Sequence, residues 1–81
     1  MGEEIGEVTH YFTSIGVGVI ELTGNLKTGD KISIKGHTTD IEMEVGSIEI
    51  DQKKIEKAGS GDSIGLKVKE RIRPGDKVFK L

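Results

Sequence analysis

Residues 26–36 read LKTGDKISIKG, a turn that leads directly into a strand. Gly29 accepts a positive φ and Asp30 can hydrogen-bond nearby backbone, so the chain reverses there. The five residues after Asp30 alternate polar with apolar, which predicts a strand with one buried face. The Gly-Asp pair returns at residues 61–62 and 75–76, each time ahead of another alternating segment. The sequence therefore predicts a β protein whose strands begin at Gly-Asp turns.

Length and composition favour one small aliphatic core. The 81 residues predict a single domain, 1–81. A chain of this size buries only roughly 60% of its unfolded surface. Apolar residues make up 33% of the chain, and Ile, Val and Leu far outnumber the two Phe and one Tyr. Such a mixture suits a small barrel filled by branched side chains. Because cysteine is absent, neither disulfides nor a thiolate metal site can stabilise the fold.

Charge and hydropathy restrict the possible partners. Fourteen acidic residues outnumber twelve basic ones, which gives a net charge of −2. A protein that binds by indiscriminate phosphate neutralisation is usually basic, so any contact with nucleic acid is expected to be local. No apolar run approaches the ~20 residues of a membrane helix, and the first residues lack signal-peptide features. We therefore expect a cytoplasmic protein without a membrane partner.

Other segments alternate in the same way as the quoted strand. They are residues 5–12, 15–22, 41–51, 64–72 and 77–81. In the first of them, Val8, His10 and Phe12 share one face. This pattern favours a packed position for His10 in the core or at its rim. It also leaves Tyr11, on the other face, as the one plausible exposed ring.

Two slips in the alternation predict irregular strands. The apolar positions change parity at Val19–Ile20 and again at Gly46–Ser47, as a β-bulge or a bend would require. Two glycines occupy the other side of the second segment and leave it bare. Residues 51–60 show no alternation, which predicts a solvated loop anchored by Ile55. Short strands separated by glycine turns, without an amphipathic helix, predict an all-β fold. We expect a small antiparallel β-barrel, closed or partly open, of about six strands.

Motifs for catalysis and metal binding are weak. His10 and His37 are the only imidazoles, and His37 stands in a polar connection with Asp40 and two threonines. Two candidate ligands without a third make a poor metal site, so a solvated loop is the favoured interpretation. Neither G-x-x-x-x-G-K-[ST] nor G-x-G-x-x-G occurs, so no nucleotide is expected. We expect no catalytic, metal-binding or cofactor-binding residues and no enzymatic activity.

A row of cations lies along the alternating segment 64–72 and ends just after it. Lys67, Lys69, Arg71 and Arg73 lie opposite the apolar positions Leu66, Val68 and Ile72. One interpretation is a rail for an RNA backbone, bound by salt-sensitive contacts. The other is pairing across neighbouring strands with Glu42, Glu44, Glu49 and Asp51, where each opposite-charge pair contributes about 0.2–1 kcal/mol. Of the two interpretations, we favour the pairing.

Several segments of the sequence, taken in order, resemble segments of two known families. Residues 6–24, 26–36, 47–50, 60–66 and 73–78 together resemble the second domain of translational GTPases, the elongation factor Tu type of β-barrel. A nearer resemblance is to a short stand-alone version of this barrel, similar to the carboxy-terminal module of collagenase-like peptidases. Residues 8–12, 16–17 and 35–40 carry that second resemblance. Some members of the peptidase family act in transfer-RNA modification.

The elongation-factor resemblance implies an outer binding surface without a GTP site. In that family the outer wall of the barrel receives the aminoacyl end of transfer RNA. On this chain the corresponding pocket would fall near Phe12, Gly18, Glu49 and Lys67. The resemblance therefore implies a non-catalytic, translation-factor-like module in protein biosynthesis that contacts transfer or ribosomal RNA or a ribonucleoprotein. Its RNA-binding residues would be Phe12, Glu49, Lys67, Lys69, Arg71 and Arg73.

The peptidase resemblance implies an alternative partner. A module of that kind would be a protein-interaction or accessory module that docks onto a larger enzyme of the peptidase or transfer-RNA-modification type. Its docking surface would be apolar, around Tyr11 and residues 16–18. Under either hypothesis we expect a monomer, because Lys77 and Lys80 protect the last strand from pairing with a second copy.

Overall fold

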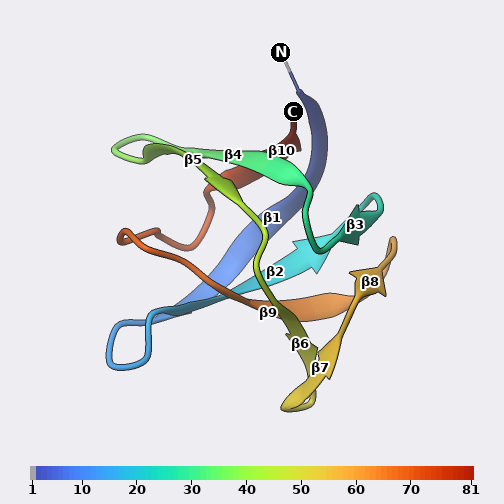
Figure 1. Ribbon diagram of the computed structural model, residues 1–81. Helices are drawn as coiled ribbons and strands as arrows, with labels where there is room; N and C mark the ends of the chain where they lie inside the picture. The colour runs from blue at the N-terminus through green and yellow to red at the C-terminus, as the bar shows by residue number, and fades with distance from the viewer. Residues whose placement is uncertain (1) are drawn as a thin grey trace.

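The computed structural model describes residues 2–81, which form ten antiparallel strands and no helix (Figure 1). The strands are β1 (Glu3–Phe12), β2 (Val17–Leu22), β3 (Leu26–Lys27), β4 (Lys31–Lys35), β5 (Asp40–Glu44), β6 (Ile48–Ile50), β7 (Lys53–Ile55), β8 (Lys57–Ala58), β9 (Ser63–Lys67) and β10 (Lys77–Lys80). The predicted all-β class is confirmed. The strand quoted first is β4, with the bounds that its alternation predicts.

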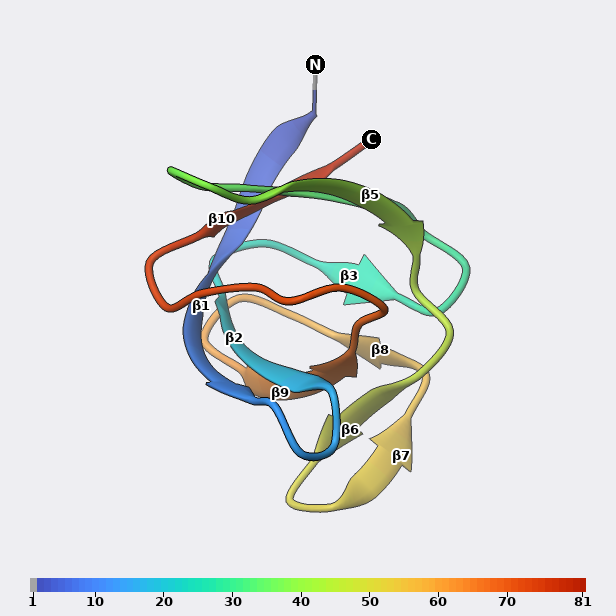
Figure 2. The ribbon, with the colours of Figure 1, turned by 90° about the vertical axis from the view of Figure 1, so that its left-hand side faces the viewer.

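One curled sheet makes up most of the molecule. Its eight strands follow the order β5-β4-β10-β1-β2-β9-β6-β7, and β3 and β8 form a separate two-stranded ribbon. Figure 2 shows the sheet bending around a central space, with both chain ends near the same rim. Because β5 and β7 each have a hydrogen-bonded neighbour on one side only, the barrel is partly open.

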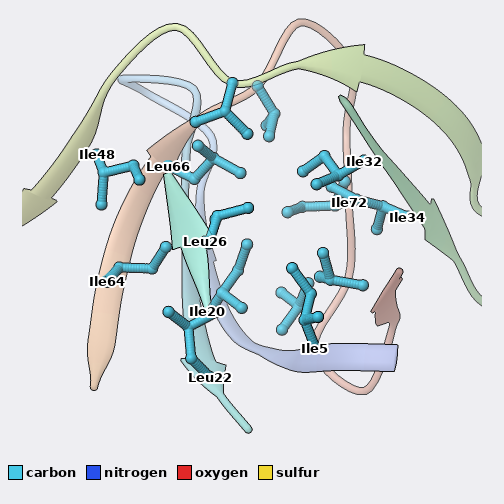
Figure 3. Close-up of a cluster of buried hydrophobic side chains, with 14 residues drawn as sticks. Ile5, Ile20, Leu22, Leu26, Ile32, Ile34, Ile48, Ile64, Leu66 and Ile72 are labelled. Atoms are coloured by element: carbon cyan, nitrogen blue, oxygen red, sulfur yellow. The ribbon is translucent and has the colours of Figure 1, made fainter. Parts of the chain in front are cut away.

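Branched aliphatic side chains fill the interior, as the composition predicts. Every fully or nearly fully buried hydrophobic residue within 2–81 is Ile, Leu or Val. Figure 3 shows these side chains extending from several strands toward one another. Burial of a side chain of this size contributes about 1.5–3 kcal/mol relative to leaving it exposed. With no disulfide available, this aliphatic cluster is the main source of stability.

Three turns share one construction. The Oδ2 atoms of Asp30, Asp62 and Asp76 accept the backbone N–H of the residue three positions earlier, at 3.1, 2.9 and 2.9 Å. The glycine before each aspartate has a φ of 91, 92 or 95°, a conformation that residues with a Cβ rarely adopt. The Gly-Asp signature thus sets both the turn geometry and the start of β4, β9 and β10.

The first predicted slip in the alternation, at Val19–Ile20, corresponds to an irregularity in β1 rather than in β2. Val8 pairs with Ile20 and His10 with Val19, so Thr9 is the extra residue of a β-bulge. A bulge moves every later side chain to the opposite face. His10 is consequently exposed, which corrects its predicted packed position. For the same reason Tyr11, the expected exposed ring, packs against the core instead.

Alternation within β2 is regular, and its inward positions are the even ones. Gly18, Ile20 and Leu22 are buried, whereas Val17 and Val19 are half-buried on the outer face. A Cβ on Gly18 would lie 2.4 Å from Cδ1 of Ile72, so Ile72 occupies the space that a side chain at position 18 would need. Gly18 therefore faces the interior and does not line an outer pocket, contrary to the position that the elongation-factor resemblance implied.

The second predicted slip separates two strands. Residues 45–47 divide the long alternating segment into β5 and β6, which stand far apart in the sheet order. The prediction of a loop at residues 51–60 is wrong, because β7 and β8 form there. Asp51 and Gln52 both have positive φ, at 52 and 66°, and make a two-residue hairpin turn between β6 and β7. Ile55 packs against the core as predicted.

Candidate functional site

The outer face of β1, β2, β9, β6 and β7 forms one continuous surface, here named the hairpin wall. Residues directly opposite each other in paired strands project to the same side. Two rows of such residues cross the wall: Phe12, Val17 and Lys67 in the first, and His10, Val19, Gly65, Glu49 and Lys54 in the second. Figure 1 shows these strands side by side in the lower half of the view.

A hollow of about 390 Å³ lies on the hairpin wall. Its lining residues are Ile15, Val17, Ser47, Glu49, Lys54, Gly65 and Lys67. The structure therefore brings Glu49 and Lys67 together at one surface hollow, whereas Phe12 stands beyond Val17 in the same row. A Cβ on Gly65 would lie 3.4 Å from Cγ1 of Val17, so this glycine keeps the floor of the hollow low without being required by packing.

Charge in the hollow is uneven. Lys54 is directly opposite Glu49, and Lys67 lies on the neighbouring strand. The ion pairs found within residues 2–81 join Lys77 with Glu7 and Lys80 with Asp30, so neither lysine of the hollow is held by one. Two ammonium groups and one carboxylate thus remain available to a partner.

Sequence reasoning overlooked most of the lining residues. Val17 belonged to the apolar docking surface expected around residues 16–18, and the structure places it half-buried on the outer face. The one usable signal was Gly65, since a glycine in a strand interior often marks the close approach of another group.

The predicted row of cations is only partly a strand. β9 ends at Lys67, and residues 68–73 continue without strand pairing, which corrects the strand expected over 64–72. Val68 and Ile72 are buried and draw this segment onto the barrel, while its cations Lys69, Arg71 and Arg73 are exposed, as is Lys67. The four cations are therefore solvent-facing, but three of them lie on an irregular segment.

The predicted pairing of these cations with acidic residues is wrong. Glu42 and Glu44 lie on β5 and are paired with β4, at the far end of the sheet order from β9. Glu49 is opposite Lys54. Within residues 2–81 none of the four cations takes part in an ion pair. They remain free to interact with an anionic partner.

The tip of the hairpin adds exposed apolar surface. Phe12, the last residue of β1, is 48% exposed, and Ile15, in the turn between β1 and β2, is 61% exposed. The rings of His10 and Phe12 stack with centroids 6.4 Å apart and an interplanar angle of 9°. Two large exposed apolar side chains so close together are typical of a surface that another molecule covers.

The described residues offer little for metal or redox chemistry. Within 2–81, no three His, Cys, Asp or Glu side chains gather closely enough to hold a metal ion. His37 lies exposed in the connection between β4 and β5. No helix in this part of the chain is long and apolar enough to cross a membrane.

A larger hollow, of about 610 Å³, lies beside the β3–β8 ribbon. Asp30 and Asp62 line it, but both carboxylates accept turn N–H groups. Asp30 is also paired with Lys80 at 3.6 Å. Because its acidic groups are already engaged, this hollow is less suited to ligand binding than the hairpin wall.

The sequence is similar to segments of curated proteases. It is 40% identical over 79 residues to an uncharacterized protease of Methanocaldococcus jannaschii. It is 37% identical over 79 residues to a collagenase of Porphyromonas gingivalis. These alignments cover 96% and 95% of this chain but 19% and 22% of the two relatives. The chain thus spans about a fifth of the length of the curated relatives it matches.

A translation factor shows a further match. Elongation factor 1-alpha of Natronomonas pharaonis is 34% identical over 73 residues, which cover 80% of this chain and 17% of the factor. This match gives weak support to the translation-factor part of the predicted resemblance. No protein-family model matches the chain.

A solved structure has the same fold. The C-terminal domain of a putative U32 peptidase of Geobacillus thermoleovorans superimposes with a TM-score of 0.91 and covers 98% of this chain and 92% of that chain. At 18% sequence identity the likeness shows the fold alone. Together with the protease matches, it confirms the collagenase-like part of the predicted resemblance. The chain is therefore an all-β module similar in sequence to a segment of these proteases and in fold to the C-terminal domain of a putative U32 peptidase.

Proposed function

We propose that this chain is a non-catalytic accessory module that docks onto a larger enzyme of the peptidase type through the hairpin wall. The observation that carries the proposal is the exposed apolar tip formed by Phe12 and Ile15 beside the hollow. The protease matches support the choice of partner, because in each of them the similar segment is a small part of a much longer protein. In this proposal the module acts as a cytoplasmic monomer.

The surface chemistry fits docking to protein. Phe12, Ile15, Val17 and Val19 give the β1–β2 side of the wall an apolar surface, and Lys54, Glu49 and Lys67 give the β9, β6 and β7 side a charged one. Protein interfaces combine apolar contact area with polar residues in this way. Aromatic residues such as Phe12 are enriched at the centre of such interfaces, where they supply most of the binding energy.

A non-catalytic role is supported by the positions of the reactive side chains. His10 and His37 are both exposed, His10 on the wall and His37 in the β4–β5 connection. Among residues 2–81, the one side-chain hydrogen-bond partner of His10 is the hydroxyl of Thr9, at 3.4 Å. General base catalysis needs a positioned group beside a substrate site, which neither imidazole offers.

Site-specific photo-crosslinking tests the proposal. A benzophenone side chain at position 15 or, as the control, at position 37 is used in native extract after nuclease treatment, and crosslinked proteins are identified by mass spectrometry. We expect position 15 to capture a protein with a peptidase segment and position 37 to capture none. Phe12→Ser should lower the yield from position 15 at least roughly tenfold, because a central aromatic anchor is lost. Equal capture from both positions would contradict the proposal.

RNA binding is a second candidate function, favoured by one specific observation. Lys67, Lys69, Arg71 and Arg73 are exposed beside the hollow, and within residues 2–81 they have no acidic partner. Phosphate contacts by such cations are strongly salt-dependent, since each releases condensed counterions. The first candidate predicts an affinity that survives moderate salt, whereas this one predicts an affinity that collapses.

Titration of labelled protein with transfer RNA at two salt concentrations separates the two candidates. RNA binding predicts saturable binding at low salt, with a salt dependence that flattens in Lys69→Glu/Arg71→Glu because two phosphate contacts are lost. A matched variant, Lys31→Glu/Lys35→Glu, carries the same charge change on β4 and should leave the salt dependence unchanged. Absence of saturable binding at low salt would exclude the second candidate.

A further inference from the structure

A second outer surface, here named the Ser33 wall, is formed by β10, β4 and β5. The register places three rows across it: Lys77, Lys35 and Asp40; Phe79, Ser33 and Glu42; and Lys31 with Glu44. Leu81 lies beside the last row, where its N–H donates to the carbonyl of Lys31 at 2.9 Å. Ser33 is therefore the central residue of this wall.

Ser33 has an unusual environment for a polar side chain. It is 2% exposed, and its Oγ has no hydrogen-bond partner among residues 2–81. A buried hydroxyl without a partner costs about 1–3 kcal/mol, so such groups are rare and often belong to a site. Ser33 lines a hollow of about 370 Å³, together with Gly2, Lys35, Glu42, Phe79 and Leu81. Its unpartnered hydroxyl thus belongs to a surface hollow.

The charges of the wall leave one carboxylate without a partner. Lys35 lies opposite Asp40 and Lys31 lies opposite Glu44, so each of these acids has a cation directly across the ladder. Glu42 lies opposite Ser33 instead. Opposite charges in facing positions stabilise a sheet, and Glu42 lacks that stabilisation. The hollow therefore presents a carboxylate and a hydroxyl, both able to accept hydrogen bonds from one cation.

Besides Gly2, the remaining lining residues are Lys35, whose charge faces Asp40 across the ladder, and the apolar pair Phe79 and Leu81. Phe79 is half-buried and Leu81 is 54% exposed, and both lie on the β10 side of the hollow. Glu42 and Leu81 also line a neighbouring hollow of about 210 Å³, so the two hollows are continuous along β5. A ligand that fits needs a cationic head for Glu42, an apolar stem for Leu81, and a chain long enough to follow β5.

We infer that the Ser33 wall binds the arginine side chain of an extended polypeptide segment. The guanidinium group donates to the Glu42 carboxylate and to Ser33 Oγ, and its flat face lies over the ring of Phe79. Arginine suits this hollow better than lysine because its planar fork donates several hydrogen bonds at once and stacks on aromatic rings. The inference does not depend on the hairpin wall, since it rests on a different face and a different partner chemistry.

NMR titration with Nα-acetyl-arginine methylamide tests the inference. We expect saturable shifts of the backbone amides of β4, β5 and β10 and of the Phe79 ring protons, with a dissociation constant of roughly millimolar for so small a ligand. Glu42→Gln should weaken binding about tenfold, because a charge-assisted hydrogen bond is lost. Ser33→Ala should weaken it by about fivefold. Ser33→Ala is expected to fold, because it removes only an unpaired hydroxyl.

Two controls make the result decisive. The citrulline analogue has the same shape without the charge, so it should bind about tenfold more weakly. Glu49→Gln, on the hairpin wall, should bind the arginine compound like the unaltered protein. Non-saturable shifts, equal affinity for the citrulline analogue, or an equal loss with Glu49→Gln and Glu42→Gln would each overturn the inference. None of these outcomes depends on whether a peptidase is the partner of the hairpin wall.

Discussion

The hairpin wall and the Ser33 wall are built from the same antiparallel pairing but offer opposite chemistry. The hairpin wall exposes Phe12 and Ile15 at its tip, and its charged residues Glu49, Lys54 and Lys67 line the adjoining hollow. On the Ser33 wall, Asp40 and Glu44 each face a lysine of β4, and Glu42 alone among the acids of β5 has no cation across the ladder. Both rest on the same aliphatic core. The difference teaches that outward residues of this fold can carry different surface chemistry over the same packed interior.

Truncation of Ile72 should have the largest effect on stability. Its structural effects should be confined to the hairpin wall. Ile72 is 1% exposed and fills the space behind Gly18, in the middle of the hairpin wall. We expect Ile72→Ala to lower the free energy of unfolding by about 2–5 kcal/mol, through lost burial and the cavity left behind. Urea denaturation measures this loss. Amide shifts should concentrate on β2 and residues 68–73 rather than on β4 and β5.

Two variants on β2 serve as controls for Ile72→Ala. Val17→Ala removes apolar bulk from the outer side of the same strand, where the side chain is only half-buried, and should cost less than about 1 kcal/mol. Gly18→Ala should be destabilising in the unaltered protein but less so combined with Ile72→Ala, because the new Cβ enters the vacated space. Equal costs for Ile72→Ala and Val17→Ala would contradict the assigned packing.

The turns that begin β10 and β9 offer a second comparison between the walls. Asp76 is 4% exposed and accepts the N–H of Arg73, whereas Asp62 makes the same bond from a half-buried position. We expect Asp76→Ala to cost about 1.5–3 kcal/mol, as for hydrogen bonds to buried charged groups, and Asp62→Ala to cost less. Thermal unfolding of the two variants measures the difference. A larger cost for Asp62→Ala would show that burial does not control the strength of these turns.

Ser33→Ala should stabilise the protein, whereas Ile72→Ala and Asp76→Ala should destabilise it. Because the buried Oγ of Ser33 lacks a partner within residues 2–81, removing it relieves a desolvation cost and should raise the free energy of unfolding by about 1 kcal/mol. Gly65→Ala, the matched change on the hairpin wall, should alter stability by less than about 0.5 kcal/mol. Chemical denaturation distinguishes the two. A destabilised Ser33→Ala would mean that the hydroxyl is bonded in solution, which would weaken the arginine inference.

Much of the fold could be predicted from local patterns. The Gly-Asp turns and β4 follow from glycine conformation and strict alternation, and they occur where expected. The errors in the first strand have one physical origin, which is that parity is read along one strand but determined by its neighbours. The bulge at Thr9 reversed the faces of His10 and Tyr11, and no residue at that position signals a bulge.

The candidate site was predictable only in part. Glu49 and Lys67 come together because they project outward on β6 and β9, which the alternation indicated. The interior place of Gly18 depends on Ile72, which reaches back from an irregular segment 54 positions later, a contact that no local pattern encodes. The Ser33 wall was overlooked because a serine at a polar position of an alternating strand is expected to be an ordinary solvent-facing residue.

The smallest expected effect concerns Lys77, which lies on the Ser33 wall but, unlike Glu42, has its charge partner. Its Nζ lies 2.6 Å from Oε1 of Glu7 across the β1–β10 ladder, and both side chains are about half exposed. The hydrogen bond to Glu7 raises the pKa of Lys77 above its ordinary value of 10.5. The stability that this pair contributes is therefore present below pH 10.5 and is lost as the pH rises through the folded pKa.

Glu7→Gln should accordingly bring the pKa of Lys77 back toward its ordinary value, as followed by the Cε chemical shift of Lys77. The small stability difference between Glu7→Gln and the unaltered protein should shrink with added salt, because exposed pairs are screened. It should also vanish at a pH where Lys77 is neutral in both folded and unfolded chains. Glu42→Gln should leave the pKa of Lys77 unchanged, because the carboxylates that raise it are Glu7 and, more weakly, Glu4. A shift of similar size in both variants would mean that the wall acts as one electrostatic unit, and the isolation of Glu42, on which its binding role rests, would be lost.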